Sequence, residues 1–102
     1  MIVEKMDLAS LASIKSCVDR LNKSETKVDV LINNAGVMMC PMARTEDGFE
    51  MQIGTNHFGH FYLTNLLLPL IKKVRVNSKY TFYVKLWLPS LMLLYFININ
   101  TG

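Results

Sequence analysis

Residues 28–36 have the sequence Val-Asp-Val-Leu-Ile-Asn-Asn-Ala-Gly, and this stretch decides the fold. It begins with β-branched and leucine side chains and ends in small or amide residues. A nearly continuous apolar run of this kind is typical of a buried strand in a parallel sheet. In open α/β sheets, ligands bind at the loop that follows the carboxyl end of such a strand. We therefore predict a strand over residues 28–32 and a ligand site in the loop 33–36.

A helix and a shorter apolar segment precede this stretch. Residues 2–6 are predicted to form a short strand that ends at Asp7 and Leu8. Ser10 is suited to cap a helix, and an amphipathic helix is predicted beyond it because apolar residues recur at three- and four-residue steps. Strand, helix and strand within one sheet imply a right-handed parallel crossover. The apolar positions of the predicted helix are Leu11, Ile14, Cys17, Val18 and Leu21.

A methionine-rich loop over residues 37–42 is followed by a long helical stretch from Phe49 to Lys73. Thr45 is predicted to be the N-cap of this helix, with Glu46 and Asp47 in its first turn, where acidic side chains are favourable. Glycine inside a helix usually marks the close approach of a neighbouring element, and proline disturbs helical turns. These positions are Gly54, Gly59 and Pro69.

The composition limits the classes of function. The chain of 102 residues is at most one domain, and its hydrophobic content of 51% is typical of a folded protein. The net charge of +3 is modest and the basic residues are scattered, which argues against nucleic acid as a partner. Cys17 and Cys40 lack a metal-binding spacing, and no metal site is predicted. Two free thiols and the absence of a signal-peptide pattern favour an intracellular location.

Residues 74–102 differ in character from the rest of the chain. They contain no acidic residue and are rich in tyrosine, phenylalanine, isoleucine, leucine and asparagine. We interpret them as a divergent apolar tail, with read-through of non-coding or frameshifted sequence as a hypothesis for its origin. The run from Leu86 to Ile99 contains Pro89 and is shorter than the ~20 residues of a membrane-spanning helix. Membrane association through the tail is kept as an alternative.

Three blocks of sequence carry a resemblance to a known family. They are Asn33–Gly36, Thr45–Glu50 (Thr-Glu-Asp-Gly-Phe-Glu) and Thr55–Phe61 (Thr-Asn-His-Phe-Gly-His-Phe). In this order and spacing they resemble the short-chain dehydrogenase/reductase superfamily, and within it the retinol dehydrogenase-like group, over about residues 2–73. The resemblance implies an α/β fold, namely part of a Rossmann-like doubly wound parallel sheet with a β-α-β-α core. Residues 1–73 would be a partial dinucleotide-binding domain, and residues 74–102 an unrelated tail.

The resemblance also implies which residues contact the cofactor, NAD or NADP. Asp7, with Leu8, matches the acidic position after the family's third strand, where the carboxylate contacts the adenine. Asn34, Ala35 and Gly36 match the block at the end of the fourth strand, where small residues let the dinucleotide approach the backbone. For Asp7 the structural alternative is an acidic residue that precedes a helix. For the block that ends at Gly36 it is a turn that ends a strand, because asparagine and glycine tolerate positive φ.

Asn56 matches the asparagine of the family's catalytic tetrad, whose backbone holds a water that relays protons. The alternative is a polar residue in a bent helix. His57 and His60 are three residues apart on the same helix. No third ligand suggests itself that would complete a metal site with them, and a structural role is predicted for both.

Two parts of the family's machinery are missing. The family transfers hydride between a nicotinamide and an alcohol or carbonyl, and this chemistry needs a tyrosine with a lysine four residues later. Four residues after the tyrosines of this chain stand Leu66, Val84, Trp87 and Ile99. The glycine-rich phosphate loop of the first strand–helix turn is absent too. We expect the chain to contact only the adenosine side of the cofactor and to be inactive by itself.

By resemblance the protein is an NAD(P)-dependent oxidoreductase that acts on retinol, retinal or another lipid aldehyde, in the cytoplasm or at the endoplasmic reticulum membrane. The alternatives are a non-catalytic fragment, a membrane-associated module, and an interaction module that forms a homo- or heterodimer through helix 49–73. The two predicted strands would be the third and fourth, which are not neighbours in the sheet order 3-2-1-4-5-6. We expect them to pair directly or to leave their edges open.

Overall fold

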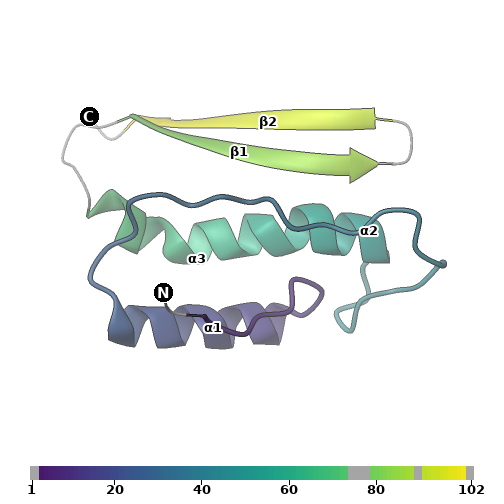
Figure 1. Ribbon diagram of the computed structural model, residues 1–102, viewed down its shortest axis with the longest axis horizontal. Coiled ribbons are helices and arrows are strands. Elements are labelled where there is room, and N and C mark those ends of the chain that lie inside the picture. The colour runs from purple at the N-terminus through teal and green to yellow at the C-terminus, as the bar shows by residue number, and fades with distance from the viewer. Residues whose placement is uncertain (1–2, 74–78, 89–90, 101–102) are drawn as a thin grey trace.

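The computed structural model describes residues 3–73, 79–88 and 91–100, and it describes side chains for residues 3–73. Helix α1 covers Leu11–Ser24, and α2 (Met51–Ile53), the π-helical segment η1 (Gly54–Gly59) and α3 (His60–Lys72) follow one another without a break. Strands β1 (Lys79–Leu88) and β2 (Leu91–Asn100) come last. Figure 1 shows α1 beneath the long α2–η1–α3 rod, with the two strands above it.

The core lies between α1 and α3, as the apolar periodicity of both segments predicts. Ser10 caps α1, since its Oγ accepts a hydrogen bond of 3.1 Å from the N–H of Ser13. This confirms the predicted start of the helix, and it satisfies one of the N–H groups that the first turn leaves without a partner. The buried apolar side chains of the core are Ile14, Val18, Leu63, Leu67, Leu70 and Ile71.

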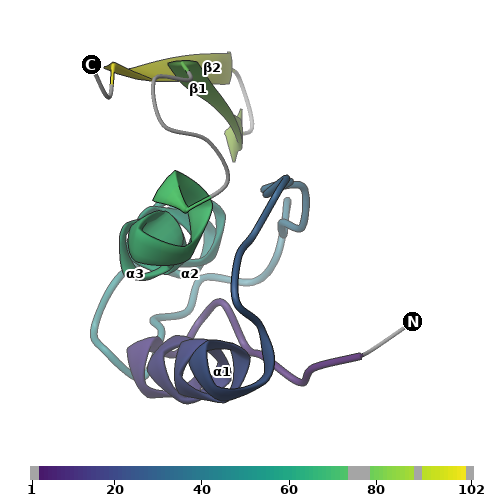
Figure 2. The ribbon, with the colours of Figure 1, turned by 90° about the vertical axis from the view of Figure 1, so that its left-hand side faces the viewer.

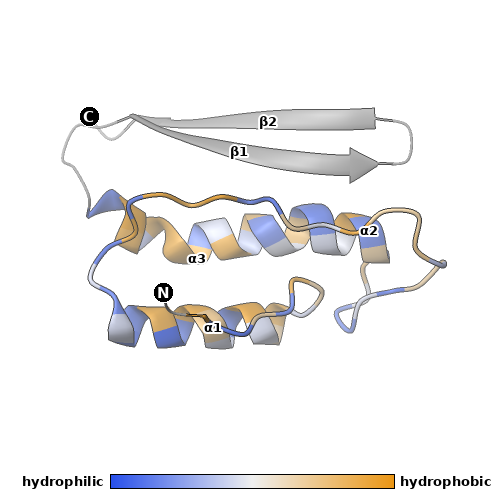
Figure 3. Ribbon diagram, viewed as in Figure 1, coloured by the Kyte–Doolittle hydropathy of each residue, from blue (hydrophilic) through white to orange (hydrophobic). Residues whose placement is uncertain are grey.

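Two extended segments, residues 3–8 and 28–36, cross the same side of the helical pair. In Figure 1 both pass in front of the helices and run in the same direction, and Figure 2 shows both on one side of the helices. Arg20 holds the first segment to α1, because its Nε lies 2.7 Å from the Glu4 carboxylate and its guanidinium donates to the Lys5 carbonyl at 2.6 Å. The apolar character of the second segment is visible as orange ribbon in Figure 3.

Neither extended segment is a strand, so the sheet predicted over residues 2–6 and 28–32 does not form in the described part of the chain. The physical reason is pairing: a strand needs a neighbour to complete its backbone hydrogen bonds, and these two segments make no backbone bond to each other. Val28 instead donates its N–H to the carbonyl of Leu70 in α3, at 3.1 Å. The two segments were expected either to pair directly or to leave their edges open, and direct pairing is therefore excluded.

The long helical stretch is confirmed over Met51–Lys72, and both of its glycines mark close approaches. A Cβ added at Gly59 would overlap the carbonyl oxygen of Leu8, and one at Gly54 would lie 2.8 Å from Cγ2 of Thr45. Gly59 therefore lets the helix rest directly on the end of the first extended segment. Helix α3 continues through Pro69 to Lys72.

The prediction that Thr45 caps this helix is wrong. Thr45 instead closes a turn, where its Oγ1 accepts from the N–H of Phe49 at 3.2 Å and its N–H donates to the Phe49 carbonyl at 2.7 Å. Glu50 is the cap, since its carboxylate accepts from the N–H groups of Gln52 (3.1 Å) and Ile53 (3.0 Å). These backbone hydrogen bonds hold the pKa of Glu50 below its usual value.

Glu46 and Asp47 also act elsewhere than predicted. The Glu46 carboxylate accepts a hydrogen bond from the hydroxyl of Ser10, and the Asp47 carboxylate accepts from the N–H of Leu11 at 2.8 Å. Both acids thus lie at the N-terminus of α1, where unpaired N–H groups and the helix dipole favour negative charge. The loop over residues 45–48 therefore ties the start of α1 to the start of the second helical stretch.

The tail forms an antiparallel hairpin in which Lys79 pairs with Asn100 and Leu88 with Leu91. In Figures 1 and 2 this hairpin lies beyond α3, on the side away from α1. Among the described residues, no helix is long and apolar enough to cross a membrane.

Replacing Asp47 by alanine should lower the free energy of unfolding by about 1 kcal/mol, because α1 loses a capping carboxylate. Urea denaturation followed by far-ultraviolet circular dichroism measures this loss. Asp29→Ala is the matched control, since that carboxylate makes an exposed ion pair with Lys27 at 3.3 Å. The control should lose less than about 0.5 kcal/mol. Equal losses in the two variants would contradict the capping role.

Candidate functional site

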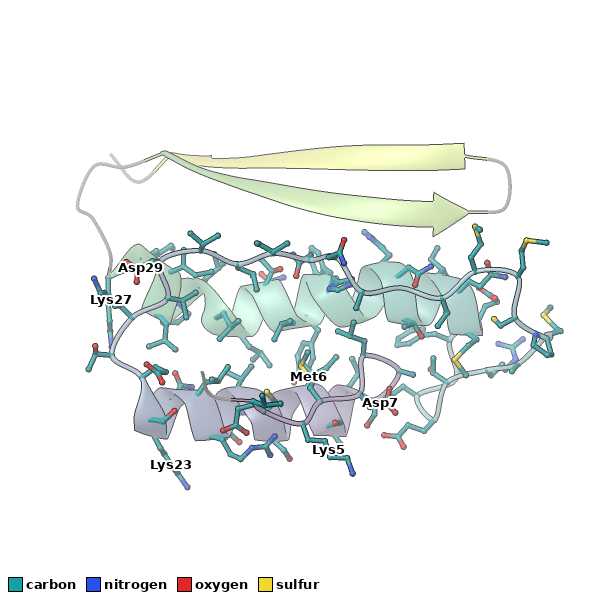
Figure 4. The ribbon with its side chains drawn as sticks, viewed as in Figure 1. Lys5, Met6, Asp7, Lys23, Lys27 and Asp29 are labelled. Carbon is teal, nitrogen blue, oxygen red and sulfur yellow. The ribbon has the colours of Figure 1, made fainter. Side chains whose placement is uncertain are left out.

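The carboxyl ends of the two extended segments lie at the same end of the molecule, as ligand-binding loops of an open α/β fold do (Figure 1). A pocket of about 240 Å³ at the end of the second segment is lined by Asn34, Gly36, Val37 and Met38. Asp7 lies where the first segment ends (Figure 4), in a separate hollow. The structure thus brings Asn34 and Gly36 to one pocket and places Asp7 outside it.

Three polar side chains on one face of η1 and α3 hold the second segment. Their positions are four residues apart along the helix, and they bind positions two residues apart along the extended chain. Four helical residues rise by about 6 Å, and two extended residues advance by about 6.6 Å, so the two spacings match. We call this set the ladder; its pairs are Asn56 with Val37, His60 with Ala35, and Thr64 with Asn33.

Asn56 makes two of these hydrogen bonds. Its Oδ1 accepts from the N–H of Val37 at 2.8 Å, and its Nδ2 donates to the carbonyl of the same residue at 2.7 Å. The side chain is 1% exposed. A Cβ at Gly36 would lie 2.9 Å from Asn56 Oδ1, so only glycine fits beside this clamp without displacing it. The side chain of the predicted catalytic asparagine therefore has a clear positional role, binding the loop through residue 37.

The two asparagines of the loop have different environments. Asn33 is buried, and its Nδ2 donates to the hydroxyl of Thr64 at 3.0 Å. Asn34 is exposed at the pocket. Successive residues of an extended chain point to opposite sides, so the buried side chain of Asn33 faces the helix while that of Asn34 faces outward. This alternation makes Asn33 an anchor and leaves Asn34 for a ligand.

His60 binds the middle of the loop and is 3% exposed. Its Nε2 lies 2.6 Å from the carbonyl oxygen of Ala35, which can only accept, so Nε2 carries the proton. Burial lowers the pKa of His60; the Ala35 carbonyl partly opposes this shift, and nearby His57 adds to it. His60 is therefore neutral at pH 7. The ring of His57 contacts those of Phe58 and Phe61 instead.

Asp7 and Leu8 form the turn between the first segment and α1. One carboxylate oxygen of Asp7 accepts from the N–H of Ala9 at 2.9 Å, and the N–H of Asp7 donates to the hydroxyl of Ser13 at 2.9 Å. The Asp7 side chain faces solvent. Leu8 contributes its backbone, on which Gly59 rests. Among the residues that the structure describes, no three His, Cys, Asp or Glu side chains form a group that could hold a metal ion.

Comparisons with known proteins show the family of the chain. Residues 1–78 match the family model for short chain dehydrogenases. The chain belongs to the short-chain dehydrogenase family. The match extends slightly beyond residue 73, where the resemblance was expected to end. Together with the relatives described below, it confirms the resemblance to the retinol dehydrogenase-like group.

The similar proteins are much longer than the matched region. Mouse retinol dehydrogenase 14 is 58% identical over 72 residues, which cover 71% of this chain and 22% of the relative. Human retinol dehydrogenase 13 is 61% identical over 67 residues (66% and 20%), and zebrafish polyprenol dehydrogenase is 54% identical over 74 residues (72% and 23%). This short-chain dehydrogenase sequence thus spans about a fifth of the length of these relatives.

A solved structure supports the fold of the family. An uncharacterized protein from Mycobacterium paratuberculosis is 55% identical and superimposes with a TM-score of 0.61, covering 68% of this chain and 24% of that one. Family membership and this neighbour imply a Rossmann-like fold. The ladder itself was not foreseen from the sequence, although the spacing of 56, 60 and 64 against 33, 35 and 37 is a signal that could have revealed it.

Replacing Gly36 by alanine should lower the free energy of unfolding by about 1–3 kcal/mol, because the added methyl displaces a clamped side chain. The three atoms nearest to the added Cβ all belong to Asn56. The same substitution in an Asn56→Ala background should therefore cost close to nothing. A double-mutant cycle from urea denaturation measures the difference, and equal costs in both backgrounds would show that Asn56 is not the obstacle.

The free energy of unfolding should decrease as the pH is lowered through the range where His60 takes up its proton. Its pKa in the folded chain lies below the ordinary 6.5, so the unfolded chain binds the proton first. The stabilising contribution of neutral His60 is complete above pH 6.5. It is lost as the pH falls from there through the pKa of His60 in the folded chain. Urea midpoints measured from pH 8 to pH 5 report this loss. His60→Gln should remove this component while keeping His57; an unchanged pH dependence would assign it to another group.

Proposed function

We propose that this chain provides the adenosine side of an NAD(P) site in a retinol dehydrogenase-like oxidoreductase. The observation that carries the proposal is the ladder, which anchors positions 33, 35 and 37 to the helix beside a pocket that Asn34 and Gly36 line. A pocket wall without a Cβ suits a ligand that lies against the backbone. The family relationship supports the assignment of a dinucleotide as this ligand.

The chain's own residues fit the adenosine part of the cofactor. Asp7 offers a solvent-facing carboxylate, which can accept a hydrogen bond from the exocyclic amine of adenine. Gly36 lets the ligand approach the backbone, and Asn34 adds an amide with both donors and an acceptor. When bound, the nicotinamide cofactor supplies the hydride chemistry. For Asp7 to share one ligand with Asn34, that ligand must extend beyond the pocket of residues 34–38.

The reaction itself needs groups that the sequence does not contain. No tyrosine is followed by a lysine at the fourth position, so a general acid–base pair of that type is missing from these 102 residues. We infer that the chain by itself binds without catalysing hydride transfer. A lipophilic alcohol or aldehyde, such as retinol or retinal, is the proposed substrate class of the complete protein, since relatives are named retinol and polyprenol dehydrogenases.

The predicted domain arrangement is part of the same proposal. Residues 1–73 would act as part of a dinucleotide-binding domain, and 74–102 as a tail outside it. Segments 3–8 and 28–36 would take the places of the third and fourth strands of a doubly wound sheet once neighbouring strands pair with them. Their common direction on one side of the helices supports this assignment (Figures 1 and 2).

An interaction module is the second candidate. Phe58 of η1 and Phe61 of α3 are 36% and 51% exposed. Exposed aromatic side chains on a helix favour contact with another protein, so pairing with a homologue or with a second copy through helix 49–73 is proposed here. An intracellular location, in the cytoplasm or at the endoplasmic reticulum membrane, also belongs to the proposal.

Calorimetric titration with ADP-ribose, the part of the cofactor without nicotinamide, tests the proposed function. Wild-type protein should bind, and Asp7→Asn should weaken binding about tenfold because an acceptor with a full charge is lost. Asparagine keeps an oxygen for the N–H of Ala9, so the turn is preserved. Asp29→Asn is the matched control and should bind as wild type does. Retinal reduction with NADPH should be undetectable, and failure of wild type to bind ADP-ribose would contradict the proposal.

A further inference from the structure

We propose that His60 is a positioning residue for the cofactor loop: its Nε2–H fixes the Ala35 carbonyl and thereby aims the Gly36 N–H at the pocket. The inference rests on the proposed nucleotide site and deepens it. It assigns a backbone donor of the site and the side chain that orients this donor.

The first step is the state of the imidazole. The Nε2 atom lies 2.6 Å from the carbonyl oxygen of Ala35, and that oxygen can act only as an acceptor. The ring is therefore the Nε2–H tautomer at neutral pH. The ring is held at the boundary of η1 and α3, with Asn56 and Thr64 of the ladder on either side of it along the helix.

The second step is the position of Nδ1. This atom is buried and, in the part of the chain that the structure describes, has no hydrogen-bond partner. Burying an unpaired acceptor is unfavourable, and an apolar side chain at position 60 would avoid this cost. The compensating feature is the bond from Nε2 to Ala35. The histidine is thus explained by what it does for the loop, since its packing alone would favour an apolar residue.

The third step follows from the peptide unit that joins Ala35 to Gly36. The structure has no cis peptide bond among its described residues. In a trans peptide the carbonyl and the next N–H point in opposite directions. Because His60 draws the Ala35 carbonyl toward the helix, the Gly36 N–H points away from the helix, and Gly36 itself lines the pocket with Asn34.

Asn56 and His60 then have complementary effects on the loop. Asn56 binds both polar backbone groups of Val37, so that residue presents neither group to a ligand. His60 binds the carbonyl one peptide earlier and leaves the N–H of Gly36 as the outward donor. Within the described residues, no acceptor takes this N–H. A ribose hydroxyl or an adenine ring nitrogen has the acceptor chemistry that this donor requires.

The experiment compares His60→Gln with His60→Asn. A glutamine amide nitrogen reaches about as far from the backbone as Nε2 does, whereas asparagine reaches only as far as Nδ1. Glutamine should therefore keep the bond to Ala35, and asparagine should lose it. The readouts are the affinity for ADP-ribose, the unfolding midpoint in urea, and the amide and carbonyl NMR shifts of residues 35–37.

We expect His60→Gln to bind within about threefold of wild type and His60→Asn to bind at least about tenfold more weakly. The carbonyl shift of Ala35 and the amide shift of Gly36 should change in the asparagine variant and be restored in the glutamine variant. Equal affinity for ADP-ribose in both variants would overturn the positioning role. Equal losses of affinity that parallel the losses in stability would overturn it too.

The NMR readout separates this inference from the proposed function. If wild-type protein binds no ADP-ribose, the proposed nucleotide site fails, and the shifts of Ala35 and Gly36 still decide whether His60 orients this peptide. Unchanged shifts in the asparagine variant would overturn the inference. Changed shifts that glutamine restores would support it.

Discussion

The hydrogen bonds between the extended segment and Asn56, His60 and Thr64 are the interaction on which the rest of this structure depends. They join residues that are 19 to 31 positions apart in sequence. In a complete sheet, backbone bonds to neighbouring strands would hold such a segment. Here side chains of a helix do so, and they can because four helical steps and two extended steps cover nearly the same distance.

This arrangement leaves one face of the extended segments without cover. Val3, Val30 and Ile32 are 81%, 74% and 78% exposed, although an apolar run over 28–32 is typical of a strand buried on both faces. The helices α1 and α3 form the layer on one side only. The exposed side chains are consistent with a fold in which a second helical layer packs against the opposite face.

The sequence predicted what depends on local pattern. The cap at Ser10, the apolar face of α1 and the close approaches at Gly54 and Gly59 follow from spacing and residue type, and the structure confirms them. The roles of Glu46 and Asp47 could not be predicted in this way, because they bind a helix end 36 residues earlier in the chain. The strands predicted over residues 2–6 and 28–32 do not form for a related reason, since pairing depends on partners that lie outside the segment itself.

The difference between local pattern and contacts between distant residues also explains why the family is recognised more readily than the activity. Gly36 meets Asn56 in space and Asn33 meets Thr64, so these residues constrain one another, as the 2.9 Å approach of a Cβ at Gly36 to Asn56 shows. A tyrosine–lysine pair with this spacing is not among the residues that make these contacts. The motif therefore reports the architecture of the cofactor loop, and the capacity for hydride transfer must be established from other residues.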